Sequence, residues 1–332
     1  NAMAYNAEYG LVDPYGGKND LKDKVIRCVG NPDTRFNEDA LRILRALRFA
    51  SVYGFSIEEN TSKSIFKNAD LLKNIATERV TSEFLKLICG KDAVKILDAY
   101  RETIAVIIPE ITVMFNFNQN NIHHSYDLWQ HTLTALGTIE PNPILRMTML
   151  LHDIGKPSVK TTDNSGQSHF QGHQLESKKI ADRILHRLRL PSDFINKTLL
   201  LIEYHDVRFN GSKKLMKKVM NVLGTDLTKQ LLEVEHADIS AQSEYQQEEK
   251  LGYIKTAKTH LNEIIKDNEC FKLSQLDING KDVLNLGVKE GRDVGNILDY
   301  LLMLVVDANV PNKKSILISK AKEYIYGNQI NK

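Results

Sequence analysis

Apolar residues recur at intervals of three and four along most of this 332-residue chain, which is the spacing of one buried face of an α-helix. Within residues 38–53, Leu41 and Leu44 belong to such a stripe. Asn37 precedes the stripe as the expected N-cap, and Gly54 follows it as the expected stop signal. The dominant pattern therefore predicts a protein built mainly from amphipathic helices.

The same periodicity predicts helices in the later parts of the chain. They are expected over residues 61–73, 77–89, 91–100, 127–139, 143–153, 174–188, 192–205, 213–223, 227–241 and 246–265. The first 30 residues differ, because residues 9–13 and 25–29 have the short, bounded apolar pattern of strands. The predicted fold class is mainly α, a multi-domain helical protein with a small N-terminal β remnant.

Breaks in this pattern predict four parts. Two or more domains are expected for a chain of this length, at roughly 150 residues each. An asparagine-rich stretch at residues 116–121 separates the first helices from a histidine-rich block. Glycines between residues 280 and 295 predict short helices joined by tight turns. We expect the parts to be residues 1–30, 31–115, 116–245 and 246–332.

Charge and composition exclude several classes of protein. Lys and Arg total 44 against 42 Asp and Glu, so the chain lacks the strong cationic field of a histone-like nucleic-acid binder. Its three cysteines are far apart, which supports neither a disulfide framework nor a CxxC site and fits a reducing cytosol. No apolar run approaches the roughly 20 residues of a membrane span, and no secretory leader is visible. We expect a cytoplasmic protein with no membrane partner.

Histidines and aspartates in the histidine-rich block are separated by intervals that place them on different predicted helices. The informative residues are His131, His152, Asp153, His173, His205 and Asp238. Imidazole and carboxylate groups are ligands of divalent metals, and inward side chains from several helices are a recurrent way to build a metal site. One such histidine alone is more often a satisfied core residue. The whole set favours a metal centre.

The doublet His152–Asp153 is the sharpest element of this set. It follows the apolar run ILRMTMLL, so both side chains are expected at the buried end of a helix, where an unpaired carboxylate is costly. Lys156, His124 and Asp127 are nearby candidates for phosphate contact or proton transfer. The pattern resembles the HD phosphohydrolase superfamily, whose signature is H…HD…D, with two additional histidines when two metals are bound. The resemblance implies metal-assisted phosphoester hydrolysis with His152, Asp153 and Lys156 as catalytic residues.

A second signal lies in the segment RFNEDALRILRALRF. Asp39 and Arg42 are neighbours at i,i+3 on a helix, Arg45 continues the stripe, and Glu38 can pair with Arg42 at i,i+4. Most such patterns are salt-bridged surface faces. The alternative is a base reader, because a carboxylate beside a guanidinium matches the amino donor and ring-nitrogen acceptor of cytosine and adenine.

This segment resembles the class II tRNA nucleotidyltransferase (CCA-adding enzyme) and poly(A) polymerase family. The neck motif EDxxR of that family matches Glu38, Asp39 and Arg42, the TERV motif matches residues 77–80, and residues 276–317 are similar to the family's C-terminal region. The resemblance implies that Asp39 and Arg42 bind incoming CTP and ATP, with a phosphate-binding or structural role for Arg45. It also implies tRNA as the partner.

The resemblance gives each predicted part a role. Residues 1–30 correspond to a remnant of the nucleotidyltransferase head, residues 31–115 to an RNA- and nucleotide-binding neck, residues 116–245 to an HD domain and residues 246–332 to a tRNA-binding tail. Basic clusters in KKLMKK (residues 213–218) and nearby helices are equally consistent with a phosphate-binding stripe and with a solvated charged face.

One departure from the family shapes the expected activity. The family's head has a Gly-rich turn and a DxD pair that binds Mg²⁺, and neither is found here, since Asp13 stands alone in LVDPYGG. Nucleotidyl transfer by two metals needs convergent carboxylates. We therefore expect a metal-dependent HD phosphohydrolase, and we do not expect nucleotidyltransferase activity from this chain alone.

Two functions remain open at this point. The first is hydrolysis of 2′,3′-cyclic, 2′- or 3′-phosphates with a divalent metal, and the ligand types do not distinguish Ni, Co, Mn, Fe and Zn. The second is non-catalytic binding of tRNA and nucleotide by a fragment of a CCA-adding enzyme or poly(A) polymerase. The sequence leaves the oligomeric state open, with a homodimer as one alternative.

Overall fold

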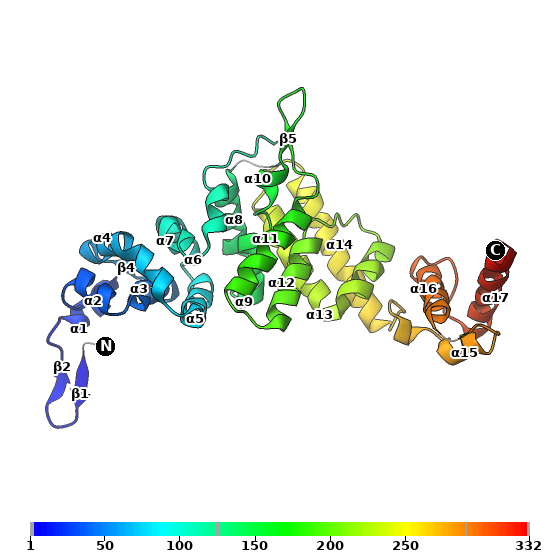
Figure 1. The fold of residues 1–332 in the computed structure, drawn as a ribbon, viewed down its shortest axis with the longest axis horizontal. Coiled ribbons are helices and arrows are strands. Elements are labelled where there is room, and N and C mark those ends of the chain that lie inside the picture. Colours follow the sequence, from blue (N-terminus) through cyan, green and yellow to red (C-terminus); the bar gives the residue numbers. More distant parts are fainter. Residues whose placement is uncertain (1–2, 122, 124–125, 290, 331–332) are drawn as a thin grey trace. The chain divides into compact units, whose positions relative to one another are not determined.

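The computed structural model describes residues 3–121, 123, 126–289 and 291–330. Of these, residues 328–330 are described by their backbone only. Helices dominate it, and strands occur as three two-stranded pairs in the described part of the chain (Figure 1). The prediction of a mainly α, multi-domain protein is confirmed. His124, a candidate for phosphate contact, lies outside the described residues.

The N-terminal region contains more regular structure than the sequence predicts. Strands β1 (Ala4–Asn6) and β2 (Gly10–Val12) form an antiparallel hairpin. Helix α1 (Gly17–Asp23) lies between the two predicted strands and was not expected. Strand β3 (Val25–Ile26) pairs in parallel with β4 (Ser56–Ile57). The prediction of short strands in this region is confirmed, although the second strand is shorter than expected.

Two helices meet where the sequence predicted one. Helix α2 (Pro32–Glu38) is followed by α3 (Leu41–Tyr53), and Asp39 between them has an extended backbone with φ −153°. The expected N-cap at Asn37 is wrong, because the side chain of Asn31 caps α2 by accepting the N–H of Thr34. The stop at Gly54 is confirmed, since its φ of 68° ends α3 in the left-handed region, where glycine is favoured.

Further helices surround α3. They are α4 (Glu59–Asn68), the 3₁₀ helix η1 (Ala69–Asn74), α5 (Thr77–Ile88), α6 (Ala93–Ala99), α7 (Arg101–Ala105) and η2 (Pro109–Met114). Leu44, Leu47 and Phe84 are completely buried where α3 packs against α5. Close packing of α3 also depends on Gly90, because a Cβ there would lie 2.1 Å from Oγ of Ser51.

The histidine-rich block is a helical bundle with a small hairpin. Its helices are α8 (Leu128–Thr138), α9 (Pro143–Leu151), α10 (Lys156–Val159), α11 (His173–Arg187), α12 (Ser192–Tyr204) and α13 (Lys213–Ser240). The antiparallel pair β5 (Thr161–Thr162) and β6 (Ser168–His169) was not expected. Gly224 interrupts α13 with non-helical dihedrals, which agrees with the two helices predicted there.

The last part of the chain has its own small core. It contains α14 (Gln247–Lys266), η3 (Leu273–Gln275), α15 (Gly280–Leu284), α16 (Arg292–Val306) and α17 (Lys314–Ile330). Val283, Leu301 and Leu317 are completely buried in a cluster shared by α15, α16 and α17. The expected short helices and turns near residues 280–295 are thus partly confirmed.

Contacts divide the chain into two compact units. The first contains residues 1–206 and 233–247, and the second contains residues 207–232 and 248–332. Every candidate metal ligand belongs to the first unit, because the segment that carries Asp238 returns to it. The finer division into four parts stays a prediction. Among the described residues, no helix is both long and apolar enough to cross a membrane.

Candidate metal centre and nucleotide pocket

The six predicted metal ligands come together, each histidine and Asp238 from a different helix. His131 lies in the first turn of α8, His173 begins α11, and Asp238 lies near the end of α13. His152 and His205 follow directly after the last residues of α9 and α12. Asp153 is the next residue after His152. The six side chains converge from several helices, and their role as metal ligands stays a prediction.

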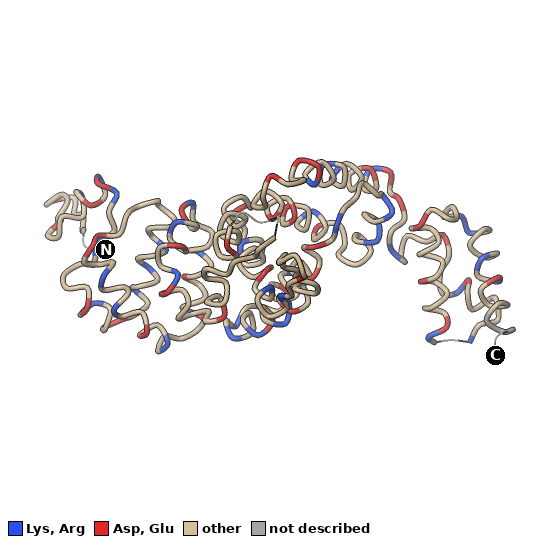
Figure 2. Tube along the Cα trace, turned by 90° about the horizontal axis from the view of Figure 1, so that it is seen from above, with Lys and Arg blue, Asp and Glu red and all other residues tan. Residues whose placement is uncertain are grey.

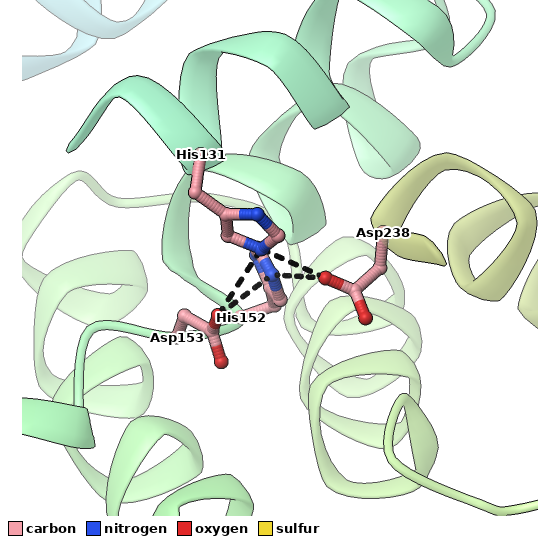
Figure 3. Close-up of side chains that lie close together, drawn as sticks. All are labelled: His131, His152, Asp153 and Asp238. Atoms are coloured by element: carbon pink, nitrogen blue, oxygen red, sulfur yellow. Dashed lines mark hydrogen bonds and ion pairs between the residues drawn. The ribbon is translucent and has the colours of Figure 1, made fainter. Parts of the chain in front are cut away.

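The ligand atoms form two groups that share Asp153. The first group is His131, His152, Asp153 and Asp238 (Figure 3), and the second is Asp153, His173 and His205. In each group the ligand atoms lie within 4.8 Å of one another. Oδ2 of Asp153 lies 3.2 Å from Nε2 of His152, and its Oδ1 lies 3.3 Å from Nε2 of His173. One carboxylate therefore faces both groups, with one oxygen toward each.

Backbone carbonyls fix the orientation of all four imidazoles. Nδ1 of His152 lies 2.7 Å from the carbonyl oxygen of Met149, and Nδ1 of His205 lies 2.7 Å from that of Ile202. His173 and His131 make the same kind of contact, with Phe170 at 2.9 Å and Ala241 at 3.2 Å. With Nδ1 held by a carbonyl oxygen, Nε2 is the nitrogen that points into the cluster and would bind a metal after losing its proton. Metal-binding histidines are commonly oriented in this way.

Burial and mutual attraction dominate the electrostatics of the cluster. Burial alone would lower the pKa of His152, but Asp153 and Asp238 outweigh it and raise the pKa to about 10. Burial alone would raise the pKa of both aspartates, but the neighbouring histidines, with Lys156 at Asp153, hold them well below their usual range. The cluster therefore places two carboxylates that favour the ionised form beside nitrogen ligands.

Buried polar atoms that lack a hydrogen bond indicate whether a metal fits this site. Nε2 of His152 and both carboxylate oxygens of Asp153 are buried and make no hydrogen bond of acceptable geometry, although Oδ2 of Asp153 forms an ion pair with Nζ of Lys156 at 2.6 Å. Buried polar atoms are normally hydrogen-bonded, so such a concentration calls for an explanation. A divalent ion accepts electron pairs from these atoms. The donor set of imidazole nitrogens and carboxylate oxygens fits Mn, Fe, Co, Ni and Zn.

Gly155 allows the two groups to lie so close together. A Cβ at this position would lie 2.5 Å from the backbone nitrogen of Ser177 and 2.8 Å from the carbonyl oxygen of His173. The N–H of Gly155 also donates to Oγ of Ser177 at 2.9 Å. The glycine thus holds the start of α11, with His173, against the turn that carries Asp153.

The other residues predicted near the cluster have distinct surroundings. Nζ of Lys156 is buried and lies 2.6 Å from Oδ2 of Asp153 and 3.1 Å from Oε1 of Gln119. Asp127 accepts the N–H of Gln130 at 2.8 Å and so caps α8, which begins too late to place Asp127 on its face. Glu235, one turn before Asp238, was not predicted. Burial, Asp238 and Asp206 raise its pKa well above the usual range.

An open pocket of about 430 Å³ lies at the break between α2 and α3. Its lining residues are Phe36, Asn37, Glu38, Asp39, Ala40, Leu71, Asn74, Ile75 and Arg79. The extended backbone at Asp39 places its carboxylate here. Oδ1 accepts the N–H of Leu41 at 3.2 Å, and Oδ2 lies 3.1 Å from Nη2 of Arg79. The pocket therefore contains an oriented carboxylate beside a guanidinium.

The predicted arginines have other partners. Arg42 donates to Glu38 at 2.7 Å and to the carbonyl oxygen of Arg35 at 2.8 Å, which confirms the pairing expected with Glu38. Asp39 and Arg42 are linked through the backbone, where the N–H of Arg42 donates to the carbonyl oxygen of Asp39 at 3.1 Å, while their side chains have the separate partners given above. Arg45 lies over the ring of Phe49, with 5.6 Å between the guanidinium carbon and the ring centroid. The nucleotide-binding roles of Asp39, Arg42 and Arg45 stay predictions.

Arg79 and Asn74 are pocket residues that the sequence did not single out. Arg79 lies in the recognised TERV motif, but no role could be assigned to it from local spacing, because it is 40 residues from Asp39. Asn74 ends η1 and carries no motif. These two residues become visible as pocket residues only when the structure brings their segments next to Asp39.

The basic clusters are neutralised within the protein. Lys213 and Lys217 pair with Glu269, while Lys214 and Lys218 both lie 3.1 Å from Oδ1 of Asp307. Positive and negative residues also intermingle along the chain (Figure 2). These contacts favour the solvated, salt-bridged face over a continuous phosphate-binding stripe at KKLMKK.

Two protein-family models match parts of the chain. Residues 54–115 match a model described as "Probable RNA and SrmB-binding site of polymerase A". Residues 173–321 match one described as tRNA nucleotidyltransferase domain 2. Both descriptions name nucleotide-adding proteins, and the two models match separate parts of this chain.

Curated relatives extend the match to nearly the whole chain. The CCA-adding enzyme of Ligilactobacillus salivarius (strain UCC118) is 28% identical over 98% of the chain and 69% of its own length. A multifunctional CCA protein of Legionella pneumophila (strain Paris) is 31% identical over 66% of the chain and 56% of its own length. The chain is therefore similar to members of the CCA-adding enzyme and poly(A) polymerase family over most of its length.

A solved structure agrees at the level of the fold. The Bacillus stearothermophilus CCA-adding enzyme in complex with CTP matches with a TM-score of 0.70 and 23% identity, over 100% of this chain and 73% of that one. The likeness shows that the arrangement of helices is shared.

The expected enzyme class needs correction. We expected a phosphohydrolase from which nucleotidyltransferase activity is absent, and this expectation is wrong, because relatives that match 98% and 95% of the chain are CCA-adding enzymes. The argument relied on a missing carboxylate pair. The chain spans 69% and 68% of the length of these two relatives.

Proposed function

We propose that this protein takes part in adding nucleotides to the 3′ end of tRNA. The observation that carries the proposal is the pocket at the α2–α3 break, where the carboxylate of Asp39 is held beside the guanidinium of Arg79. The relatives named as CCA-adding enzymes support this reaction, and the structural neighbour bound to CTP supports a nucleotide as the ligand.

The chemistry of the pocket suits two of the four nucleobases. A carboxylate accepts a hydrogen bond from the amino group of cytosine or adenine, and a guanidinium donates to the adjacent ring nitrogen. Uracil and guanine offer the reverse order of donor and acceptor at these positions. Asp39 still has lone pairs beyond those used by Leu41 and Arg79, so it can accept an additional donor. Arg42 fixes the last turn of α2, next to this carboxylate.

Nucleotide binding to the purified chain tests the proposal. Wild-type protein should bind CTP and ATP more tightly than UTP and GTP. Asp39→Ala should weaken CTP and ATP binding roughly tenfold, the effect of losing a hydrogen bond to a charged group, and affect GTP less. Asp70→Ala is the matched control, because Asp70 is an exposed carboxylate that pairs with Lys73 and does not line the pocket. Equal binding of all four nucleotides by the wild type would contradict the proposal.

The His–Asp cluster favours a second function, metal-dependent hydrolysis of phosphoesters, in addition to the first. It is supported by the four oriented imidazoles and the shared carboxylate of Asp153. All six candidate ligands would hold the metal, which would supply an activated water and neutralise phosphate charge. Lys156, beside Asp153, offers a cation for a phosphate oxygen. The proposed substrates carry 2′,3′-cyclic, 2′- or 3′-phosphates, as RNA ends do.

Hydrolysis of 2′,3′-cyclic AMP tests the second function. After chelation, Ni²⁺, Co²⁺, Mn²⁺ or Mg²⁺ is added singly, and water should add to phosphorus while the bond to one ribose oxygen breaks. His152→Ala should abolish turnover. His186→Ala is the matched control, because His186 is exposed on α11 and pairs with Asp182 outside the cluster. Absence of turnover with every metal, or turnover retained by His152→Ala, would contradict this function.

A further inference from the structure

The exposed face at the end of α3 is organised around aromatic rings. Phe49 and Tyr53 stack with ring centroids 5.9 Å apart and planes inclined by 14°. Phe55 continues the row beyond the turn, with its ring centroid 5.8 Å from that of Tyr53. Tyr53 is 52% exposed, which is high for a large aromatic side chain. We call Phe49, Tyr53 and Phe55 the α3 aromatic strip.

Packing beneath the strip holds its first ring in place. The guanidinium of Arg48 lies over Phe49, 4.1 Å from the ring centroid, and Nε of Arg48 lies 3.0 Å from Oε2 of the buried Glu83. Arg48 is therefore tied to α5 by a partly buried ion pair. The ring of Phe49 rests on this fixed group, and Tyr53 rests on Phe49. The strip is thus a supported surface and not a loose collection of side chains.

Cations without carboxylate partners lie at both ends of the strip. Among the residues that the structure describes, Arg45 has no ion pair, and its guanidinium extends over the edge of the strip at Phe49. At the other end, the side chain of Lys91 lies against the turn after Tyr53, so that a Cβ on Gly54 would be 3.0 Å from its Nζ and 3.1 Å from Oδ2 of Asp92. No ion pair forms at Lys91 in the described part of the chain. This contrasts with the paired lysines of KKLMKK.

Exposed rings flanked by unpaired cations suit a single nucleic-acid strand. Unpaired bases stack on aromatic side chains, and cations beside the rings contact the phosphates between bases. A paired duplex cannot use such a row, because its bases are already stacked on one another. The chain matches the RNA-binding model from residue 54 onward, where the strip ends.

We propose that the α3 aromatic strip binds the unpaired nucleotides at the 3′ end of an RNA. The exposed ring of Tyr53 stacks with a base, and Arg45 and Lys91 contact the phosphates on either side. This inference rests on the proposed function in tRNA 3′-end processing, and it adds the site at which the single-stranded end is held.

Two RNA minihelices that differ only at the 3′ end test the proposal on the full chain. One ends in unpaired nucleotides, the last replaced by 2-aminopurine, and the other is blunt. Tyr53→Leu should weaken binding of the overhanging RNA about tenfold, the effect of losing one base–aromatic stack, and should abolish quenching of 2-aminopurine fluorescence. Its binding of the blunt RNA should not change. Arg45→Gln should reduce the slope of log affinity against log salt by about 0.7.

Phe66→Leu is the matched control for the loss of an exposed ring. Phe66 is 46% exposed and stacks on Tyr100 at 5.1 Å, but it lies on α4 and no cation lies over it. This variant should bind both RNAs as the wild type does. Circular dichroism verifies that each variant is folded.

The possible outcomes distinguish a failure of the proposed strip from a failure of the proposed function. A wild type that prefers the overhanging RNA and a Tyr53→Leu variant that keeps this preference would overturn the strip and leave the function standing. Equal losses on both RNAs would also overturn it, because they would indicate a general RNA surface. A wild type that binds neither RNA would overturn the proposed function and the strip with it.

Discussion

The His–Asp cluster and the α2–α3 pocket are both polar sites in one helical unit, but they are built differently. The cluster is closed, with His131, His152 and Asp153 almost completely buried and each imidazole fixed by a backbone carbonyl. The pocket is open, and its charged pair of Asp39 and Arg79 is partly exposed. A closed site whose nitrogen and oxygen atoms can donate electron pairs is suited to a small ion, whereas an open pocket admits a nucleotide.

This difference predicts how each site responds to substitution. In the cluster, one residue serves both groups, so a single change affects every ligand. In the pocket, water can replace a lost contact, so single changes have smaller effects. The strongest variants should therefore be in the cluster.

Asp153→Asn should have the largest effect. The amide would keep the shape of the side chain but remove the charge and offer a donor toward the imidazoles, so both groups lose their shared ligand. Isothermal titration with Mn²⁺ or Co²⁺ should show metal affinity reduced at least about 100-fold, the scale of losing a charge-stabilised ligand. Retained affinity would mean that the groups do not depend on Asp153.

Gly155→Ala should disrupt one of the two ligand groups and leave the other intact. The added methyl group would press on the backbone at Ser177 and His173 and displace the start of α11. We expect metal binding through His173 and His205 to weaken strongly, while the group containing His131 and His152 keeps its ion. The stoichiometry of bound metal measures this result. An unchanged stoichiometry would show that α11 adjusts without consequence.

Arg79→Gln should have a smaller effect, at the pocket. Asp39 would lose the guanidinium at its Oδ2 while keeping the N–H of Leu41 at Oδ1. Affinity for CTP and ATP should fall by roughly fivefold, within the range for a partly exposed charged hydrogen bond. Arg189→Gln is the matched control, because Arg189 pairs with the exposed Glu78 and does not line the pocket. Equal losses in both variants would indicate a general effect of charge.

Asp33→Asn should have the smallest effect, confined to stability. Hydrogen bonds from Lys67, Ser64 and Asn68 lower the pKa of Asp33 to about 2, from 3.8 in its ordinary state. Because the folded-state pKa is depressed, its stabilisation is fully present above pH 3.8 and is lost as the pH falls toward 2. Denaturant unfolding should show a deficit in the variant at pH 6 that disappears near pH 2. A deficit independent of pH would contradict this account.

The cluster could be predicted from the sequence more completely than the pocket. Buried helical runs such as the one before His152 fix where a side chain lies, so the intervals between ligands indicated separate helices. The orientation of the imidazoles and the role of Gly155 could not be predicted, because they depend on contacts between α9, α10 and α11. Glu235 gave no signal, since one buried glutamate in a helix has no distinctive pattern.

The pocket was only half predicted, for a physical reason. The motif at Glu38, Asp39 and Arg42 suggested one continuous helix, on which Asp39 and Arg42 would be neighbours. Pro32 and the cap at Asn31 instead begin a separate helix that ends at Glu38, with Asp39 as its extended C-cap. The guanidinium beside Asp39 then comes from Arg79, on another helix. Local spacing predicts neighbours within one helix, but it does not predict pairs between helices.

Metal binding by the chelated wild-type chain tests the central claim about the cluster most directly. Titration with Mn²⁺ or Co²⁺ should show saturable binding of at least one ion per chain by the wild type and by His186→Ala. His152→Ala should show a large loss of affinity with its helical content unchanged. Absence of binding by the wild type, or equal binding by His152→Ala, would contradict the account and leave the cluster as a buried hydrogen-bond network.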